Sequence, residues 1–234
     1  MDITSKENQI LNDSCENILK ELPEKSVDLI LTDPPYDLET HGGTKSPLAQ
    51  RAAKVRDRIE FIANDFDFLG IASECVRIAK TIVMFCSNAQ IARTMSYFSE
   101  KGFSTTLCVW DKPNPPPLGN NKLVNNLEYI VVARSKDTFF NNDLPIEKKR
   151  MSYCYPSPAN KQHPAEKPVL LFCDLINLYS PEGGIVMDCF SGSGTTAIAC
   201  HRLKRRFICI EKDKNYYEMS VKRLEDEQKQ MQLF

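Results

Sequence analysis

The chain has 234 residues, of which 42% are hydrophobic and 26% are charged, and its formal net charge is -1. These values are those of an ordinary globule of one large domain and argue against a protein coated in positive charge, although a local basic patch can still contact nucleic acid. The sequence has no run of about 18 apolar residues and no signal-peptide pattern, so we expect a cytoplasmic protein without a membrane span. The nine cysteines include no C-x-x-C pair, so we expect reduced thiols rather than a metal site.

Apolar segments typical of buried strands alternate with segments of helical periodicity along most of the chain. The expected strands span residues 9–13, 27–32, 81–86, 103–110, 127–133, 184–188 and 207–211, and the expected helices span residues 15–21, 64–80, 89–100, 169–179, 197–203 and 216–230. This order predicts an α/β fold with a mostly parallel sheet that helices cover on both faces. We expect the strands at 103–110 and 127–133 to be antiparallel neighbours at one side of the sheet.

Two segments lack this periodicity and are rich in basic residues. Residues 37–65 have the composition of a loop, and a loop of this length is usually functional or disordered. Residues 135–165 combine the basic run Lys148–Arg150 with Tyr153 and Tyr155. Cations suit phosphates and aromatic rings suit bases, so both segments could contact nucleic acid, but a solvated loop explains each equally well.

The strand at residues 27–32 runs into the tetrapeptide Asp33-Pro34-Pro35-Tyr36. Because proline cannot donate to a strand ladder, the strand must end here and present Asp33 and Tyr36 at its C-terminal edge, where open α/β sheets bind ligands. A carboxylate, stiff backbone carbonyls and an aromatic ring suit a flat molecule with an exocyclic amine. The simpler alternative is a strand that merely ends in a proline turn.

A second group of candidate residues lies near the C-terminus. Gly192 and Gly194 follow the strand that ends at Asp188, in a turn where the lack of a Cβ lets a ligand approach the backbone. Glu211 ends the next strand, where it can accept both hydroxyls of a ribose, and Asp13 ends the first strand. Acids at three strand ends favour a nucleoside with a positive charge, such as S-adenosylmethionine. Asp13 and Asp188 could instead only cap the helices that follow them.

Three motifs, in this order, resemble the DNA methyltransferases that methylate exocyclic amines. They are Asp33-Pro34-Pro35-Tyr36, His163-Pro164-Ala165-Glu166-Lys167-Pro168 and Asp188-Cys189-Phe190-Ser191-Gly192-Ser193-Gly194-Thr195-Thr196. Because the catalytic tetrapeptide precedes the cofactor motif, the chain is similar to the permuted β class over nearly its whole length. The resemblance implies a single Rossmann-like methyltransferase domain over residues 1–234, with a mostly parallel seven-stranded sheet, one antiparallel strand and helices on both faces. Many members have proline where this chain has Cys189.

The resemblance also implies a role for each matching residue. In the catalytic tetrapeptide, Asp33 and the carbonyl of Pro34 would accept the amino hydrogens of a base flipped out of double-stranded DNA, while Pro35 stiffens the turn and Tyr36 stacks on the base. Glu211 would hold the ribose of the cofactor. The residues expected to bind S-adenosylmethionine are Asp13 at the adenine amine, Lys167 at the cofactor carboxylate, and Asp188, Phe190, Ser191, Gly192, Ser193, Gly194, Thr195, Thr196 and Glu211.

The reaction implied by the resemblance is site-specific methylation of the N6 amine of adenine. The first alternative is the N4 amine of cytosine, but that subclass more often has serine at the position of Asp33. Methylation of RNA or of a protein amide, where asparagine is commoner, and an idle cofactor-binding module are more distant alternatives. Residues 37–65 would form a flexible DNA-contacting loop and residues 135–165 a small target-recognition insertion. Relatives in the class are often dimers, and either a stand-alone enzyme or the partner of a cognate restriction endonuclease would fit.

Overall fold

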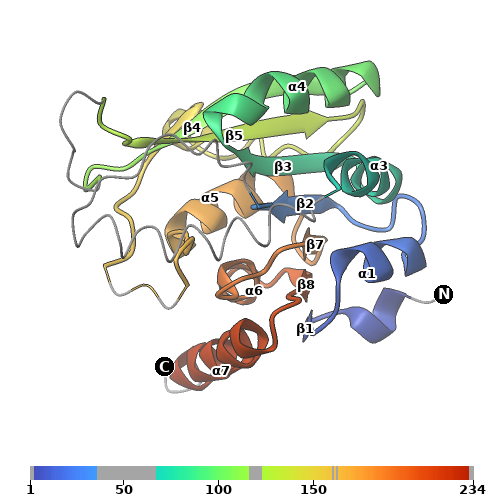
Figure 1. Cartoon of the computed structure of the whole chain (residues 1–234), viewed down its shortest axis with the longest axis vertical. Coiled ribbons are helices and arrows are strands. Elements are labelled where there is room, and N and C mark those ends of the chain that lie inside the picture. The colour runs from blue at the N-terminus through green and yellow to red at the C-terminus, as the bar shows by residue number, and fades with distance from the viewer. Residues whose placement is uncertain (1–2, 36–66, 116–122, 160, 162, 232–234) are drawn as a thin grey trace, which may run out of the picture.

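The computed structural model describes residues 3–35, 67–115, 123–159, 161 and 163–231. The strands in these ranges are β1 (Gln9–Leu11), β2 (Leu29–Thr32), β3 (Thr81–Cys86), β4 (Ser104–Asp111), β5 (Leu127–Arg134), β6 (Ser152–Cys154), β7 (Ile185–Asp188) and β8 (Arg206–Ile210). The helices are α1 (Cys15–Glu21), α3 (Phe68–Ile78), α4 (Ile91–Glu100), α5 (Val169–Tyr179), α6 (Thr195–Arg202) and α7 (Lys214–Met231), with 3-10 helices η1 (Ile3–Lys6), η2 (Asn88–Gln90) and η3 (Ile146–Lys149). The strands form a sheet in the order β1-β8-β7-β2-β3-β5-β4-β6, between two groups of helices (Figure 1).

Side chains of the central strands enter two separate hydrophobic cores, one on each face of the sheet. In β2, Leu29 and Leu31 join the core formed with α5, α6 and α7, whereas Ile30 joins the core formed with α1, α3 and α4. Every residue of β2 and β3 is buried, as expected for strands covered on both faces. Phe85 of β3 stacks on Phe172 of α5 with ring centroids 5.6 Å apart. The continuous apolar runs at β2 and β3 therefore reflect strands that are buried on both faces of the sheet.

The direction of the strands agrees with the sequence-based prediction, but their number does not. Among the described strands, β5 runs antiparallel to its neighbours β3 and β4, and the other neighbouring pairs are parallel. Within the described ranges the sheet has eight strands rather than the expected seven. The additional strand, β6, pairs with β4 and places Tyr153 opposite Trp110. It was missed because it has three residues and only Tyr153 is buried, which is too short for an alternating pattern.

The strand order reverses between β2 and β7. From β2 the chain continues to β3 on one side, whereas from β7 it continues through α6 to β8 on the other side. Such a reversal leaves a crevice outside the C-terminal ends of the strands, which is where open α/β sheets bind ligands. Asp33 follows β2 and Asp188 ends β7, so both acids lie at this crevice.

The segment expected to be an insertion, residues 135–165, contacts α5. The backbone N of Asn141 donates to the carbonyl of Leu178 at 2.9 Å, and Lys148 Nζ lies 2.9 Å from Asp174 Oδ1. The hydroxyl of Tyr155 donates to the same carboxylate. The segment thus belongs to the main fold through α5 and β6, and its part in target recognition stays a prediction. The other segment, residues 37–65, lies outside the described residues.

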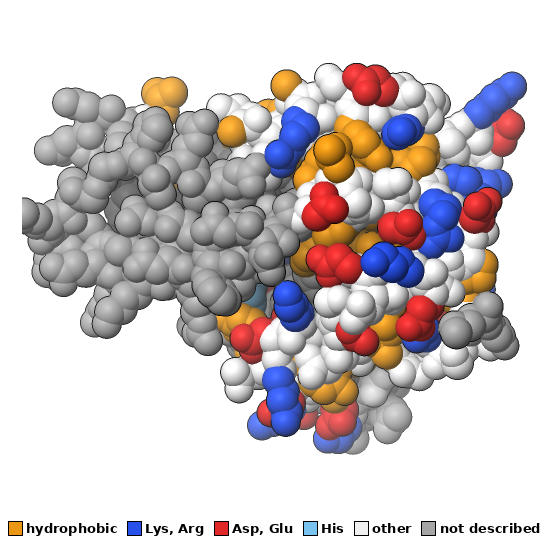
Figure 2. All heavy atoms as spheres, turned by 45° about the vertical axis from the view of Figure 1, so that its right-hand side comes forward, with side chains coloured by type: hydrophobic (Ala, Val, Ile, Leu, Met, Phe, Trp, Pro, Cys, Tyr) orange, Lys and Arg blue, Asp and Glu red, His pale blue; other side chains and the backbone are white. Residues whose placement is uncertain are grey.

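The visible surface carries both signs of charge. Figure 2 shows acidic and basic side chains interleaved over the described part of one face, in keeping with the net charge of -1. Within the described ranges, no helix combines the length and the apolar character that crossing a membrane requires.

Candidate active site

Asp188 ends β7 and organises the turn that follows it. The residue is 3% exposed, and its carboxylate accepts hydrogen bonds from Thr32 Oγ1 at 3.0 Å, from the backbone N of Phe190 at 3.1 Å and from the hydroxyl of Thr196. Thr32 Oγ1 in turn accepts a bond from the backbone N of Cys189 at 3.2 Å. Burial raises the pKa of Asp188 to about 6, even though its three donors favour the ionised form. Asp188 therefore fixes the turn on which the predicted cofactor site depends.

The glycine turn bends back toward the end of β8. Gly192 and Gly194 have φ values of +51° and +76°, which favour glycine over other residues. The backbone N of Gly192 donates to Glu211 Oε2 at 2.8 Å, and the backbone N of Asp213 donates to Oε1 at 2.8 Å. Burial raises the pKa of Glu211. The expected partners Asp188, Gly192 and Glu211 are thus brought together at neighbouring strand ends.

His163 covers the glycine turn from the other side. A Cβ on Gly192 would lie 3.4 Å from His163 Nδ1, and the imidazole packs edge-on against Tyr216 with ring centroids 4.3 Å apart. His163 Nδ1 accepts a bond from the backbone N of Ala165 at 3.2 Å. Burial, together with the charge of Lys167, lowers the pKa of His163 to about 4. The ring is neutral near pH 7, and it accepts a hydrogen bond within its own turn.

The hydroxyl groups of the cofactor motif face inward. Ser191, Ser193, Thr195 and Thr196 are all buried, and Ser193 Oγ lies 3.2 Å from Thr195 Oγ1. Thr195 Oγ1 also lies 3.5 Å from the carbonyl oxygen of Lys167. The hydroxyls of Ser193, Thr195 and Thr196 hold the turn at the start of α6. Contact of these four residues with a cofactor stays a prediction. Phe190, from the same motif, is half-buried against the core that contains α1 and α3.

Asp33 is held by a lysine that the sequence analysis assigned elsewhere. Lys167 Nζ donates to Asp33 Oδ2 and lies 3.3 Å from Glu128 Oε2, at the start of β5. The Lys167 side chain is 5% exposed, and although burial lowers its pKa, the charges of Asp33 and Glu128 outweigh burial and raise it. The expected position of this ammonium was the cofactor carboxylate. In the structure the ammonium bridges two carboxylates, one directly after β2 and one at the start of β5.

Two other residues predicted for the site are Asp13 and Tyr36. Asp13 Oδ1 accepts bonds from Asn17 Nδ2 at 2.8 Å and from the backbone N of Ser14 at 2.7 Å, so this carboxylate is held against the start of α1. The bonds from Asn17 and Ser14 lower the pKa of Asp13. Its contact with adenine stays a prediction. Tyr36 lies outside the described residues, whereas Pro34 and Pro35 follow Asp33 beyond the last residue of β2.

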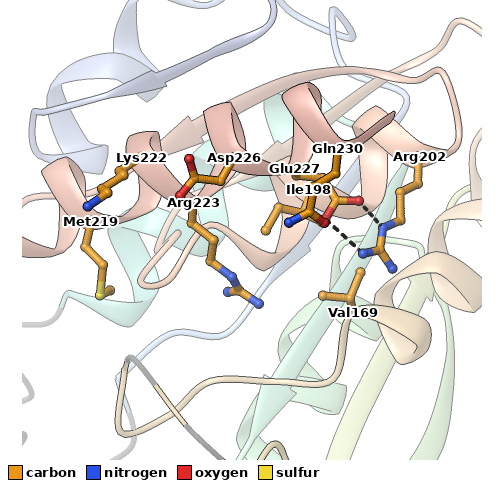
Figure 3. Close-up of a pocket in the computed structure, with 9 residues that line it drawn as sticks. All are labelled: Val169, Ile198, Arg202, Met219, Lys222, Arg223, Asp226, Glu227 and Gln230. Atoms are coloured by element: carbon orange, nitrogen blue, oxygen red, sulfur yellow. Dashed lines mark hydrogen bonds and ion pairs between the residues drawn. The ribbon is translucent and has the colours of Figure 1, made fainter. Parts of the chain in front are cut away.

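Arg223 on α7 supports the glycine turn from behind. Its Nη1 donates to the carbonyl of Ser193 at 2.9 Å, and its Nη2 lies 2.8 Å from Glu166 Oε1. Arg223 lines a groove of about 480 Å³ between α5, α6 and α7, where Arg202 and Glu227 form an ion pair (Figure 3). Among the residues that line this groove, Arg223 connects α7 to the cofactor motif through its bond to the Ser193 carbonyl.

Sequence reasoning missed three residues that the structure adds to the site. Thr32 could have been noticed as a polar residue in an apolar strand, directly before Asp33. Glu128 and Arg223 carry no such signal, because a charged residue at the start of a strand or on an amphipathic helix is usually solvated. Only the packing of distant segments shows what these two residues contact.

The sequence and the structure both match known methylases. The profile of the N6/N4 DNA methylase family matches residues 27–222 of this chain. The Type II methyltransferase M2.DpnII from Streptococcus pneumoniae is 30% identical over 232 residues, which cover 89% of this chain and 86% of that protein. The Type II methyltransferase M2.MboI from Moraxella bovis is 28% identical over 92% of this chain and 86% of that protein.

Solved structures show the same fold. The crystal structure of the M1.HpyAVI-SAM complex has a TM-score of 0.68 and 29% identity, and the match covers 92% of this chain and 99% of that chain. The cytosine-N4-specific PvuII DNA methyltransferase has a TM-score of 0.69 at 17% identity, over 94% of this chain and 90% of that chain. The second likeness concerns the fold alone. Together they confirm the predicted Rossmann-like methyltransferase fold.

Proposed function

The chain belongs to the N6/N4 DNA methylase family, and from that premise we propose that it transfers a methyl group from S-adenosylmethionine to the N6 amine of an adenine in DNA. The observation that carries the proposal is the position of Asp33, whose carboxylate lies at the strand-order reversal beside Asp188 and the glycine turn. An aspartate at this position, rather than a serine, favours adenine over cytosine as the target base.

The residues around the glycine turn fit S-adenosylmethionine. Asp188 and Glu211 place two carboxylates beside the turn, which suits a cationic nucleoside and disfavours a bare phosphate. Gly192 has a left-handed φ and a Cβ there would lie 3.4 Å from His163 Nδ1, so glycine suits the tight turn that brings its backbone N to Glu211. When bound, the cofactor supplies an electrophilic methyl group. The M1.HpyAVI-SAM complex, which is 29% identical, supports the same choice of cofactor.

The role of Asp33 follows from the chemistry of an aromatic amine. The amine lone pair is delocalised into the base, so the nitrogen is a poor nucleophile until hydrogen bonds to its N–H groups favour a pyramidal geometry. An ionised Asp33 can accept one such bond, and the carbonyl of Pro34 can accept another. The amine can attack the methyl group without first losing a proton to a strong base. Much of the rate acceleration then comes from holding the base in this orientation.

The proposal is tested by measuring transfer of labelled methyl from S-adenosylmethionine to unmethylated duplex DNA. Asp33→Ala should lower the rate by at least about 10²-fold, because it removes a preorganised acceptor at the reacting nitrogen. A matched control, Glu100→Ala, changes an exposed acid at the last residue of α4 and should keep wild-type activity. Robust methylation by Asp33→Ala would contradict the proposed role of the tetrapeptide.

Three features of DNA handling complete the proposal. Residues 37–65 would contact DNA, and the basic run Lys148–Arg150 in residues 135–165 would help to recognise the target. The base would be flipped out of the duplex to reach Asp33.

A homodimer and a cognate restriction endonuclease stay predictions. Light scattering of the purified chain during gel filtration decides the first, since a monomer at all concentrations would contradict it.

A further inference from the structure

Lys167 occupies an enclosed position between the ends of three strands. Its Nζ donates to Asp33 Oδ2 after β2, lies 3.3 Å from Glu128 Oε2 on β5, and lies 5.2 Å from the ring centroid of Phe85 on β3. The side chains of Lys167 and Asp33 are only 5% and 15% exposed. A second lysine, Lys112, lies 3.2 Å from Glu128 Oε1. Lys112, Glu128, Lys167 and Asp33 thus form a row of alternating positive and negative charges.

This geometry restricts Asp33 more than a surface ion pair would. An exposed lysine exchanges partners freely, but an ammonium with almost no access to water must keep the oxygen ligands that surround it. Lys167 is further fixed by its own chain, because its Nζ donates to the carbonyl of Ala165 at 3.2 Å and its carbonyl lies 3.5 Å from Thr195 Oγ1. The direction of the Asp33 carboxylate is therefore set by a group that cannot move far.

We propose that Lys167 is a positioning residue for methyl transfer, which holds Asp33 ionised and fixes the rotation of its carboxylate for the target amine. This inference rests on the proposed function and deepens it. Glu128 anchors the ammonium from the opposite side, and Lys112 balances the charge of Glu128. The sequence alone placed Lys167 at the cofactor carboxylate, and the two roles make different predictions for binding and for turnover.

The local charge balance explains why an ionised Asp33 needs Lys167. Without that ammonium, Asp33 would face other carboxylates in a partly buried crevice, where like charges favour uptake of a proton. A protonated carboxyl offers fewer acceptor sites for an amine, so turnover would fall. Among the described residues, the titratable and charged groups around this position, from every element that packs there, are Asp33, Cys86, Lys112, Glu128, Lys161, His163, Glu166, Lys167 and Asp188.

The decisive comparison is Lys167→Met against Lys167→Arg, with Lys101→Met as a control at an exposed position beyond the end of α4. Lys167→Met should lower kcat by about 10²-fold at pH 7 with saturating cofactor and DNA, because misplacement of a catalytic group costs about that much. The affinity for S-adenosylmethionine, measured by calorimetry, should stay within about 2-fold of wild type. Lys167→Arg should recover part of kcat, since it restores the charge with altered geometry.

The pH profile separates positioning from a merely structural role. For Lys167→Met, the acidic limb of the kcat profile should move to higher pH, and part of the lost rate should return as the pH is raised. In an Asp33→Asn background, Lys167→Met should cause no further loss of rate, because the two residues act as a unit. An unshifted profile, an equal further loss in that background, or a selective loss of cofactor affinity with unchanged kcat would each overturn the inference.

A second variant keeps the test informative if Lys167→Met fails to fold. Lys167→Met/Glu128→Gln removes one positive and one negative charge and so leaves the net charge of this cluster unchanged. It should show the same loss of kcat with retained cofactor affinity, and wild-type turnover at all pH values would refute the inference. Failure of the proposed function is distinguishable, because the wild-type chain itself would then transfer no methyl group to DNA, and the inference would fall with it.

Discussion

Gly194→Ala tests how strongly the glycine turn depends on its backbone conformation. Gly194 has φ +76°, and a Cβ at this position would lie 3.0 Å from the Cβ of Ser220 on α7. A left-handed conformation costs a residue with a Cβ about 1–2 kcal/mol. Overpacking against a neighbour costs about 1–3 kcal/mol more. The substitution should therefore lower the free energy of unfolding by about 2–5 kcal/mol.

Two other glycines separate the two contributions. Gly183 has φ +68° with nothing within 4 Å of an added Cβ, so Gly183→Ala carries the conformational cost alone. Gly184 has no left-handed φ, but its Cβ would lie 3.0 Å from Asp28 Oδ2 and from Pro181, so Gly184→Ala carries the contact cost alone. Gly194→Ala should be more destabilising than either, because it combines both.

Urea denaturation and thermal melting of the three variants give the comparison directly. For a chain of this size, each kcal/mol should lower Tm by about 2–4 °C, so a loss of about 3 kcal/mol corresponds to about 6–12 °C. Calorimetry should also show weaker binding of S-adenosylmethionine by Gly194→Ala than by Gly183→Ala. Equal stability of these two variants would refute the reasoning that the turn is confined against α7.

The affinity for S-adenosylmethionine should fall as the pH is lowered through about 6, because burial raises the pKa of Asp188 to about 6 and protonation removes a negative charge beside a cationic ligand. Calorimetry at several pH values checks this, and Asp188→Asn should flatten the dependence. Phe172→Ala should lower the free energy of unfolding by about 3–5 kcal/mol, because it empties a core position stacked on Phe85, and a loss below about 1 kcal/mol in urea denaturation would contradict this. Arg223→Met should lower Tm more than Arg223→Met/Glu166→Gln, because the single variant leaves Glu166 buried without this cation; equal melting temperatures would count against it.

Local patterns predicted most of the elements. The bounds of α1 and α5 coincide with the predicted ones, because Ser14 and Pro168 mark their starts and apolar stripes run through their length. α6 begins at Thr195, two residues before the predicted start, because Gly194 in a left-handed conformation is its N-cap. Strand β6 was not predicted, because its three residues carry too little local pattern. Its pairing with β4 depends on a tertiary contact, the burial of the Tyr153 side chain.

Some residues of the candidate site could likewise be predicted from local patterns, and others could not. Asp33, Asp188, Gly192 and Glu211 were predictable, because parallel strands bring their C-terminal ends to one edge of the sheet. The partner of Asp33 was not predictable, since Lys167 lies 134 positions away in the chain. No local pattern indicates that this ammonium turns toward β2 rather than toward the glycine turn. The contact depends on where the segment before α5 crosses the ends of the strands.

The most direct test of the central claim is mass spectrometry of nucleosides from duplex DNA that was incubated with S-adenosylmethionine and the purified chain. We expect N6-methyladenine with the wild type and its loss with Asp33→Ala. N4-methylcytosine as the product, or equal N6-methyladenine from Asp33→Ala, would contradict the assignment of Asp33 as the acceptor for an adenine amine.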